Sequence, residues 1–282
     1  MRILLTGADG FTGRQFIRSA AQAGHEVVAL KADLTKAADV ATEVASARAD
    51  AVVHLAAIAF VGHQDARAFY DVNLFGTLNL LEALAASHAS LQCVLLASSA
   101  NVYGNCEQSP IAETQTPAPV NHYAMSKLAM EHMARTFLPR LPVVMARPFN
   151  YTGPGQAPNF VIPKLVEHFR RRASSISMGN LHVEREYNDV RFLCEAYLRL
   201  LQQAQAGDTC NICTGVTHDL RAVVACLERL TGHKMDVQVD PALVRGNEIH
   251  RLCGDPSHLR ATIGELPAYT LEQTLTTMLA AA

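Results

Sequence analysis

The sequence predicts an α/β fold in which a doubly wound parallel sheet carries a smaller C-terminal lobe. Short apolar runs alternate with longer amphipathic runs through the first half of the chain, an order typical of parallel sheets with helices on both faces. A glycine-rich turn directly follows the first apolar run. The length of 282 residues suits one large domain, or one domain with a smaller lobe.

The first half of the chain is expected to supply most of the sheet. Strands are predicted at residues 2–6, 26–30, 51–57, 91–97 and 141–146, and helices at 14–23, 35–49, 69–87 and 123–138. Residues 105–120 are rich in Pro, Gln and Thr and are expected to form a loop. These elements predict a dinucleotide-binding domain over residues 1–150.

After residue 150 the pattern changes. Helices are predicted at residues 159–172, 189–205, 217–230, 256–263 and 271–279, and strands near Asn211 and at 235–239. We expect residues 189–215 to return to the sheet. Residues 151–188 and 216–282 would then form a smaller, substrate-binding lobe over the carboxyl edge of the strands.

The glycine-rich turn is Gly7-Ala-Asp-Gly10-Phe-Thr-Gly13, between a predicted strand and a predicted helix. Glycines permit a tight turn, and backbone amides at a helix N-terminus can cradle a pyrophosphate. The spacing is Gly-x-x-Gly-x-x-Gly, not the Gly-x-Gly-x-x-Gly of the best-known dinucleotide fingerprint. Three glycines at this place predict a phosphate-binding turn in a Rossmann-type sheet.

Two cations stand near the predicted position of the cofactor ribose. A free ribose 2′-hydroxyl usually meets an acid near the end of the second strand, but here Lys31 stands there and Arg14 follows the third glycine. Both could meet a 2′-phosphate, which favours NADP(H) over NAD(H). The alternative is that both are solvated surface cations. Asp33 and Leu34 follow almost at once, so this connection is unusually short.

Small residues end the third predicted strand, in His54-Leu-Ala-Ala57. Small side chains at the carboxyl end of a parallel strand let a flat cofactor approach, because ligands bind at that edge of the sheet. The next predicted helix, residues 69–87, carries Asn73.

Tyr123 and Lys127 lie four residues apart on a predicted helix, so they share one face. A tyrosine hydroxyl titrates near ~10, and a nearby lysine cation favours the phenolate and lowers that pKa. A tyrosine tuned in this way can exchange a proton with an alcohol or carbonyl oxygen. The Tyr-x-x-x-Lys pattern alone is common. The alternative interpretation, without function, is a surface lysine beside a half-buried tyrosine.

The composition limits the classes of partner. A net charge of −2 gives no electrostatic reason to expect nucleic acid or an anionic membrane. No apolar run approaches the ~18 residues that a membrane span needs. The seven scattered cysteines fit reduced thiols in a cytoplasmic protein. The histidines show no metal-ligand spacing, so we expect no metal site.

Together these motifs strongly resemble the extended short-chain dehydrogenase/reductase family over nearly the whole chain. The resemblance rests on Thr6-Gly7-x-x-Gly10-x-x-Gly13, His54-Leu-Ala-Ala57, Ser98-Ser99, Tyr103-Gly104, Tyr123-x-x-x-Lys127, Arg147-Pro-Phe-Asn150 and Gly254-Asp-Pro-Ser257. The segment from Arg147 to Gln156 looks most like reductases of nucleotide-linked 4-keto-6-deoxyhexoses, whose products are rhamnose- or 6-deoxytalose-type sugar nucleotides linked to GDP or dTDP.

The resemblance implies roles at the matching positions. Tyr123 would be the general acid of the reduction, Lys127 would hold the nicotinamide ribose and lower the tyrosine pKa, and Ser99 would bind the carbonyl oxygen. The implied cofactor-binding residues are Gly7, Gly10, Phe11, Thr12, Gly13, Arg14, Lys31, Asp33, Leu34, Leu55, Ala56, Ala57, Asn73, Tyr123, Lys127 and Pro148. The implied substrate-binding residues are Ser99, Asn101, Asn150, Val161, Arg185, Arg245 and Glu248. Family members also pair two long helices, which here predicts a homodimer through residues 69–87 and 123–138.

One departure argues against a dehydratase. Dehydratases of this family carry an acid just after the catalytic Ser or Thr, and here Ala100 and Asn101 occupy those positions. Two other functions stay open. A 4-epimerase with a retained NAD would use the same Ser, Tyr and Lys, and a non-catalytic dinucleotide-binding regulator would need none of them. The sequence leaves open the base of the nucleotide and the stereochemistry of the product.

Overall fold

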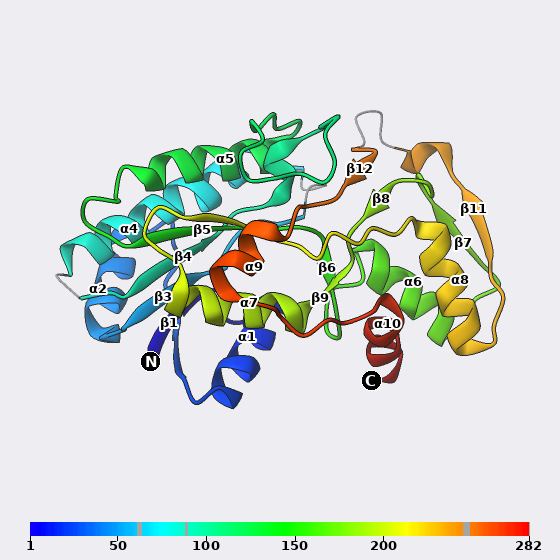
Figure 1. The fold of residues 1–282 in the computed structure, drawn as a ribbon, viewed down its shortest axis with the longest axis horizontal. Helices are drawn as coiled ribbons and strands as arrows, with labels where there is room; N and C mark the ends of the chain where they lie inside the picture. The colour runs from blue at the N-terminus through cyan, green and yellow to red at the C-terminus, as the bar shows by residue number, and fades with distance from the viewer. Residues whose placement is uncertain (61–63, 88–89, 245–248, 282) are drawn as a thin grey trace.

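A six-stranded parallel sheet lies at the centre of the larger part of the described chain (Figure 1). The structure is a computed structural model that describes residues 1–60, 64–87, 90–244 and 249–281. The strands are β1 (Arg2–Thr6), β2 (Glu26–Leu30), β3 (Ala51–His54), β4 (Cys93–Ala97), β5 (Val143–Pro148) and β10 (Thr209–Ile212). Their order is β10-β5-β4-β3-β1-β2, and all neighbours run parallel. The predicted doubly wound parallel sheet is confirmed.

The strand order changes direction between β1 and β3. In open α/β sheets ligands bind outside the carboxyl ends of the strands at such a switch point. Among the described residues β2 is the edge strand, whereas the 3-2-1-4-5-6 order has a further strand beyond it. The chain after Lys31 forms a single helix, α2 (Ala37–Ala47), and then enters β3 on the other side of β1. It therefore adds no strand beyond β2.

Helices cover both faces of the sheet. Alternate residues along each strand face opposite sides, so Ile3 and Leu5 pack in one buried cluster and Leu4 in the other. The first cluster takes side chains from α1 (Phe11–Gln22), α7 (Val190–Gln203) and α9 (Ser257–Ile263). The second takes them from α2 (Ala37–Ala47), α4 (Thr77–Ala86) and α5 (His122–Arg135).

A smaller lobe lies beyond the carboxyl edge of the sheet, at the right of Figure 1. Its core gathers α6 (Val161–Arg170), α8 (Leu220–Thr231), α10 (Leu271–Ala280) and the parallel pair β7 (Ser175–Met178) and β11 (Asp236–Val239). Two further pairs of short parallel strands are present, and a 3₁₀ turn spans Pro241–Leu243. The pairs are β6 (Tyr151–Thr152) with β9 (Asn188–Asp189) and β8 (Glu184–Arg185) with β12 (Arg251–Leu252). The division of the chain into two domains stays a prediction.

The sequence did not predict β6, β7, β8, β9 or β12. Four of these strands have two residues each, and β7 has four, of which two are exposed. Such segments are too short to show a periodicity. Their partners also lie between 37 and 67 residues away along the chain, as in Tyr151 with Asn188 and Arg185 with Leu252.

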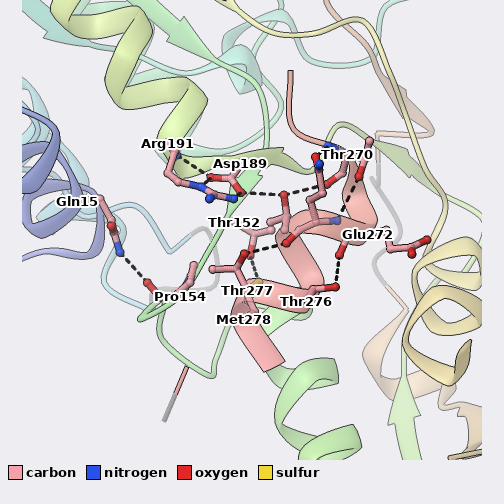
Figure 2. A network of polar contacts seen from close by, with 12 residues as sticks. Gln15, Thr152, Pro154, Asp189, Arg191, Thr270, Glu272, Thr276, Thr277 and Met278 are labelled. Atoms are coloured by element: carbon pink, nitrogen blue, oxygen red, sulfur yellow. Dashed lines mark hydrogen bonds and ion pairs between the residues drawn. The ribbon is translucent and has the colours of Figure 1, made fainter. Parts of the chain in front are cut away.

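The C-terminal helix α10 docks on the junction between the sheet and the lobe (Figure 2). Thr270 caps the helix, with its side chain accepting from the Gln273 amide. Thr274 Oγ1 donates to Asp189 Oδ2 at 2.9 Å, and Arg191 pairs with the same buried carboxylate. Because Asp189 also caps α7, one carboxylate fixes the start of α7 against α10.

The helix predicted at residues 69–87 is divided into three parts. It consists of α3 (Ala66–Tyr70), a π-helical segment (Asp71–Gly76) and α4. π-Helical turns are rare and occur often at functional sites. This one carries the buried Asn73, whose amide bonds the backbone of Ile58.

A chain of buried polar groups links β1 to this helix. Thr6 Oγ1 lies 2.7 Å from His54 Nδ1, and His54 Nε2 lies 2.8 Å from Thr77 Oγ1. The Thr77 hydroxyl donates to the carbonyl oxygen of Asn73 at 2.7 Å. Burial, and after it the charge of Lys127, lowers the pKa of His54 to about 3.

We expect His54 to make the protein less stable in acid. Its pKa is about 3 when folded and 6.5 when free, so below pH 6.5 the unfolded chain binds a proton that the folded chain does not. Stability should then fall by up to about 1.4 kcal/mol per pH unit as the pH is lowered through this window. In urea titrations between about pH 6.5 and pH 4, His54→Gln should flatten the slope of unfolding free energy against pH. His258→Gln, at an exposed position of α9, should leave the slope unchanged. Equal slopes for the wild type and His54→Gln would contradict the prediction.

Candidate active site

The glycine turn lies at the carboxyl end of β1, beside the switch point. Gly7 has φ +70°, and a Cβ there would lie 2.7 Å from the backbone N of Ala56 at the end of β3. A Cβ on Gly13 would collide with the carbonyl oxygen of Gly7. Gly10 is the N-cap of α1, and among the described residues no side chain caps this helix. Its first amides, including those of Phe11 and Thr12, are therefore available to a phosphate, and the turn fits the pyrophosphate of a dinucleotide.

The two cations expected near a 2′-phosphate differ in their surroundings. The Arg14 guanidinium donates to the carbonyl oxygens of Asp9 and, at 3.2 Å, Gly155. Lys31 is exposed at the end of β2. The Asp33 carboxylate accepts hydrogen bonds from the amide and the hydroxyl of Thr35. These bonds lower the pKa of Asp33.

Leu55, Ala56 and Ala57 follow β3 and are half-buried. The amide of Ala56 donates to Thr6 Oγ1 at 3.1 Å, which ties this segment to the end of β1. The Asn73 side chain donates at 3.1 Å to Ser126 Oγ, on the helix of Tyr123 and Lys127. Asn73 thus contacts α5 and the segment after β3.

Two other predicted cofactor positions complete this edge. Leu34 is buried against the second cluster, and Pro148 is the last residue of β5, next to Ile212 of β10. Both therefore lie close to carboxyl ends of strands. Their contact with a cofactor stays a prediction.

Ser99, just after β4, and Tyr123, in the first turn of α5, have side chains close enough to interact. Ser99 is 5% exposed and Tyr123 is 8% exposed. Asn121 caps α5 by accepting from the amide of Ala124 at 2.9 Å, which sets the helix start two residues before Tyr123. Burial raises the pKa of Tyr123, and the hydrogen bond from Ser99 opposes that rise.

Lys127 lies one helical turn after Tyr123 and is 3% exposed. Its Nζ donates to the carbonyl oxygen of Ala97, the last residue of β4, at 2.7 Å. Burial lowers the pKa of Lys127 to about 8, against the charge of Glu131. We expected the lysine to lower the pKa of Tyr123, but the net direction in this structure is upward because burial of the phenol dominates.

A buried ion pair lies beneath these residues. Glu131, one turn after Lys127, accepts from Arg147 Nε at 2.9 Å and from Arg147 Nη2 at 2.6 Å. Ser98 Oγ donates to the same carboxylate at 2.5 Å, and Arg147 Nη1 donates to the Tyr103 hydroxyl at 2.9 Å. This cluster joins α5 to the ends of β4 and β5. The spacing of four residues from Lys127 was the signal in the sequence that could have indicated Glu131.

The predicted substrate residues are more dispersed. Asn101 donates to Ser99, Asn150 is exposed just after β5, and Val161 opens α6. Arg185 is buried in β8 and donates to the carbonyl oxygen of Glu184 at 2.8 Å. Arg245 and Glu248 lie outside the described residues. The roles of all the predicted site residues stay predictions.

Tyr151 was not predicted from the sequence, although it directly follows Asn150. Its ring stacks on Phe11 with centroids 6.1 Å apart, and its hydroxyl lies 2.8 Å from Thr12 Oγ1. Gln15 also donates to the carbonyl oxygen of Pro154 at 2.9 Å (Figure 2). These contacts join the segment after β5 to the glycine turn.

The described residues contain no group of three or more His, Cys, Asp or Glu side chains that could hold a metal ion. No helix in the described ranges is long and apolar enough to span a bilayer. All seven cysteines lie in those ranges, and each is a free thiol.

A Rossmann-type sheet with serine, tyrosine and lysine at its carboxyl edge is the arrangement of an extended short-chain dehydrogenase/reductase. The chain matches the family model for GDP-mannose 4,6 dehydratase over residues 20–278 and belongs to that family.

Two relatives cover almost the whole chain. GDP-6-deoxy-D-talose 4-dehydrogenase of Aggregatibacter actinomycetemcomitans is 34% identical over 269 residues, which is 94% of this chain and 92% of the relative. GDP-6-deoxy-D-mannose reductase of Pseudomonas aeruginosa is 34% identical, over 99% of this chain and 96% of the relative.

Two solved structures are also similar. One, described as an epimerase from Burkholderia cenocepacia, is 43% identical with a TM-score of 0.93 and covers 99% of this chain and 96% of that chain. The other, RMD from Pseudomonas aeruginosa complexed with NADPH, is 32% identical with a TM-score of 0.90, over 99% and 97% of the chains. Both likenesses agree with the Rossmann-type fold.

We expect Glu131→Gln to destabilise the protein by about 3–5 kcal/mol, because Arg147 would keep a buried charge without its partner. The matched control is Glu195→Gln, which removes a partly exposed pair with Arg199 on α7 and should cost less than about 1 kcal/mol. Urea unfolding at neutral pH measures both. A loss at Glu131 no larger than that at Glu195 would contradict this view of the ion pair.

Proposed function

We propose that the protein is an NAD(P)H-dependent 4-ketoreductase of a GDP-linked 4-keto-6-deoxyhexose. The observation that carries the proposal is the Ser99–Tyr123 pair, with Lys127 one turn further, at the carboxyl edge of the sheet. The names of the two relatives support a GDP-linked 6-deoxy sugar over a dTDP-linked one. The product is a rhamnose- or 6-deoxytalose-type sugar nucleotide, depending on which face of the sugar is turned to the nicotinamide.

Ser99, Tyr123 and Lys127 each have a different role in the transfer of one proton to the substrate. A bound nicotinamide dinucleotide supplies the hydride for C4 of the sugar. Tyr123 donates a proton to the C4 oxygen as negative charge develops there, and Ser99 donates a second hydrogen bond to the same oxygen. Lys127 holds a positive charge one turn below and stabilises the phenolate that remains on Tyr123.

Elimination of water is disfavoured in spite of the family name. A 4,6-dehydratase needs an acid/base group beside the catalytic serine, and Ala100 and Asn101 cannot take that role. The Asn101 side chain instead donates to Ser99 Oγ. This contact supports a reductase over a dehydratase.

A 4-epimerase with a retained NAD is the alternative. One similar structure is described as an epimerase, and a UDP-glucose 4-epimerase of Streptomyces lividans is 28% identical over 95% of this chain. An epimerase would use the same Ser99, Tyr123 and Lys127. Net consumption of the reduced cofactor distinguishes the two reactions.

We further propose that the enzyme is a homodimer in a reducing, cytoplasmic compartment. Phe75 and Met125 are large apolar side chains that are 53% and 44% exposed on neighbouring helical segments. Burying them against a second copy would remove this apolar area from water. The seven free thiols support a reducing compartment.

A substrate panel tests the function. GDP- and dTDP-4-keto-6-deoxyhexoses are offered with NADH or NADPH, and the product sugar is identified. We expect one cofactor equivalent to be oxidised for each GDP-linked 4-keto sugar reduced.

Tyr123→Phe should lower turnover by roughly 10²–10⁴-fold, the usual loss for a general acid, and should keep its fold and cofactor binding. Sugar conversion without cofactor consumption would establish the epimerase, and near-full turnover of folded Tyr123→Phe would refute the mechanism.

NADP(H) is the proposed preferred cofactor, in accordance with the NADPH complex of a similar structure. If Lys31 and Arg14 both meet a 2′-phosphate, replacing both with Ala should raise KM for NADPH far more than KM for NADH. Each charge-assisted hydrogen bond lost corresponds to roughly ten- to a hundredfold. Because Arg14 already bonds two carbonyl oxygens, we expect Lys31→Ala alone to give most of the effect. Equal changes for both cofactors would mean that the cations are surface charges only.

A further inference from the structure

The hydroxyl of Ser99 has three polar neighbours. The backbone N–H of Asn101 and its side-chain Nδ2 each lie 3.2 Å from Ser99 Oγ and donate to it. The third neighbour is the phenol of Tyr123. A serine hydroxyl has two acceptor sites and one proton. Since Asn101 fills both acceptor sites, Ser99 is left to act as a donor.

We propose that Asn101 is a positioning residue that sets the direction of the Ser99 hydroxyl. With Asn101 in place, the Ser99 proton points to Tyr123 and, when substrate is bound, to the carbonyl oxygen that is reduced. The proposal rests on the ketoreductase function proposed above. It gives Asn101 a role that acts through Ser99, in place of the direct substrate contact expected from the sequence.

The local backbone holds Asn101 in this position. Ser99 is the N-cap of a 3₁₀ turn (Ala100–Tyr103), so the amide two residues later points back at its side chain. Val102 and Tyr103 are fully buried, and Gly104 leaves the turn with φ +64°. A turn fixed at both ends keeps the Asn101 side chain over Ser99.

The identity of the side chain decides the direction of the hydrogen bond. A carboxylate at position 101 only accepts, so it would draw the Ser99 proton to itself. An amide donates through Nδ2 and leaves that proton for the substrate. A hydrogen bond aimed at a developing oxyanion strengthens in the transition state, so the amide should act on kcat more than on KM.

A double-mutant cycle with Ser99→Ala tests the proposal. We expect Asn101→Ala to lower kcat by about 2- to 10-fold with KM unchanged, the range of one ordinary hydrogen bond. In the Ser99→Ala background the same change should alter kcat by less than about twofold, because its target is gone. Asn101→Asp should lower kcat by about 10²–10³-fold, as loss of an oxyanion donor does.

A second readout needs neither sugar nor cofactor. The tyrosinate absorbance of each protein, minus that of its Tyr123→Phe counterpart, gives the pKa of Tyr123 by pH titration. A Ser99 proton aimed at Tyr123 favours the phenolate. Both Ser99→Ala and Asn101→Ala should therefore raise this pKa, and the double variant should raise it no further than Ser99→Ala alone.

The outcomes separate this proposal from the proposed function. Additive losses of kcat together with a raised KM for Asn101→Ala would show that Asn101 contacts the substrate itself, and would overturn the proposal. An unchanged Tyr123 pKa in Asn101→Ala would overturn it as well. A wild-type protein inactive on every sugar would refute the ketoreductase function, and the tyrosine titration would still decide the role of Asn101.

Discussion

The buried ion pair of Glu131 with Arg147 is the interaction on which the carboxyl edge of the sheet depends. Glu131 is 2% exposed and takes two hydrogen bonds from Arg147 and one from Ser98. Removing one partner would leave an unpaired buried charge, so α5 and the ends of β4 and β5 cannot shift independently at low cost. Because Ser98 is held in this way, the next residue, Ser99, is placed beside Tyr123.

A second buried network links the glycine turn to the same helix. The chain of contacts runs from Thr6 through His54 and Thr77 to Asn73, whose side chain reaches Ser126 on α5. Thr6 and His54 lie at the ends of β1 and β3, where the sheet changes direction. The glycine turn and the helix of Tyr123 therefore share one support, which suits the proposed reaction because it needs cofactor and substrate in fixed register.

Family membership and reaction type are determined by different residues. The sheet, the glycine turn and the Ser, Tyr and Lys side chains are common to dehydratases, epimerases and reductases of nucleotide sugars. The feature that argues against a dehydratase is the residue type next to the serine. At Asn101 an amide that donates to Ser99 Oγ stands where an acid would be needed for elimination, and we propose that Ser99 is thereby left to donate to the substrate carbonyl.

The sequence alone determined the parallel sheet, the glycine turn and the Tyr123–Lys127 pair, because each follows from a local period or spacing. It did not indicate that Glu131 pairs with Arg147, that Tyr151 stacks on Phe11, or that Asn101 bonds Ser99. The first two pairs join residues 16 and 140 positions apart, and only chain packing decides such contacts. The third lies within three residues, but the direction of its hydrogen bonds depends on how the 3₁₀ turn folds over Ser99. Tertiary structure also decided the direction of the Tyr123 pKa, since burial of the phenol raises it, whereas the spacing to Lys127 had predicted a lowered pKa.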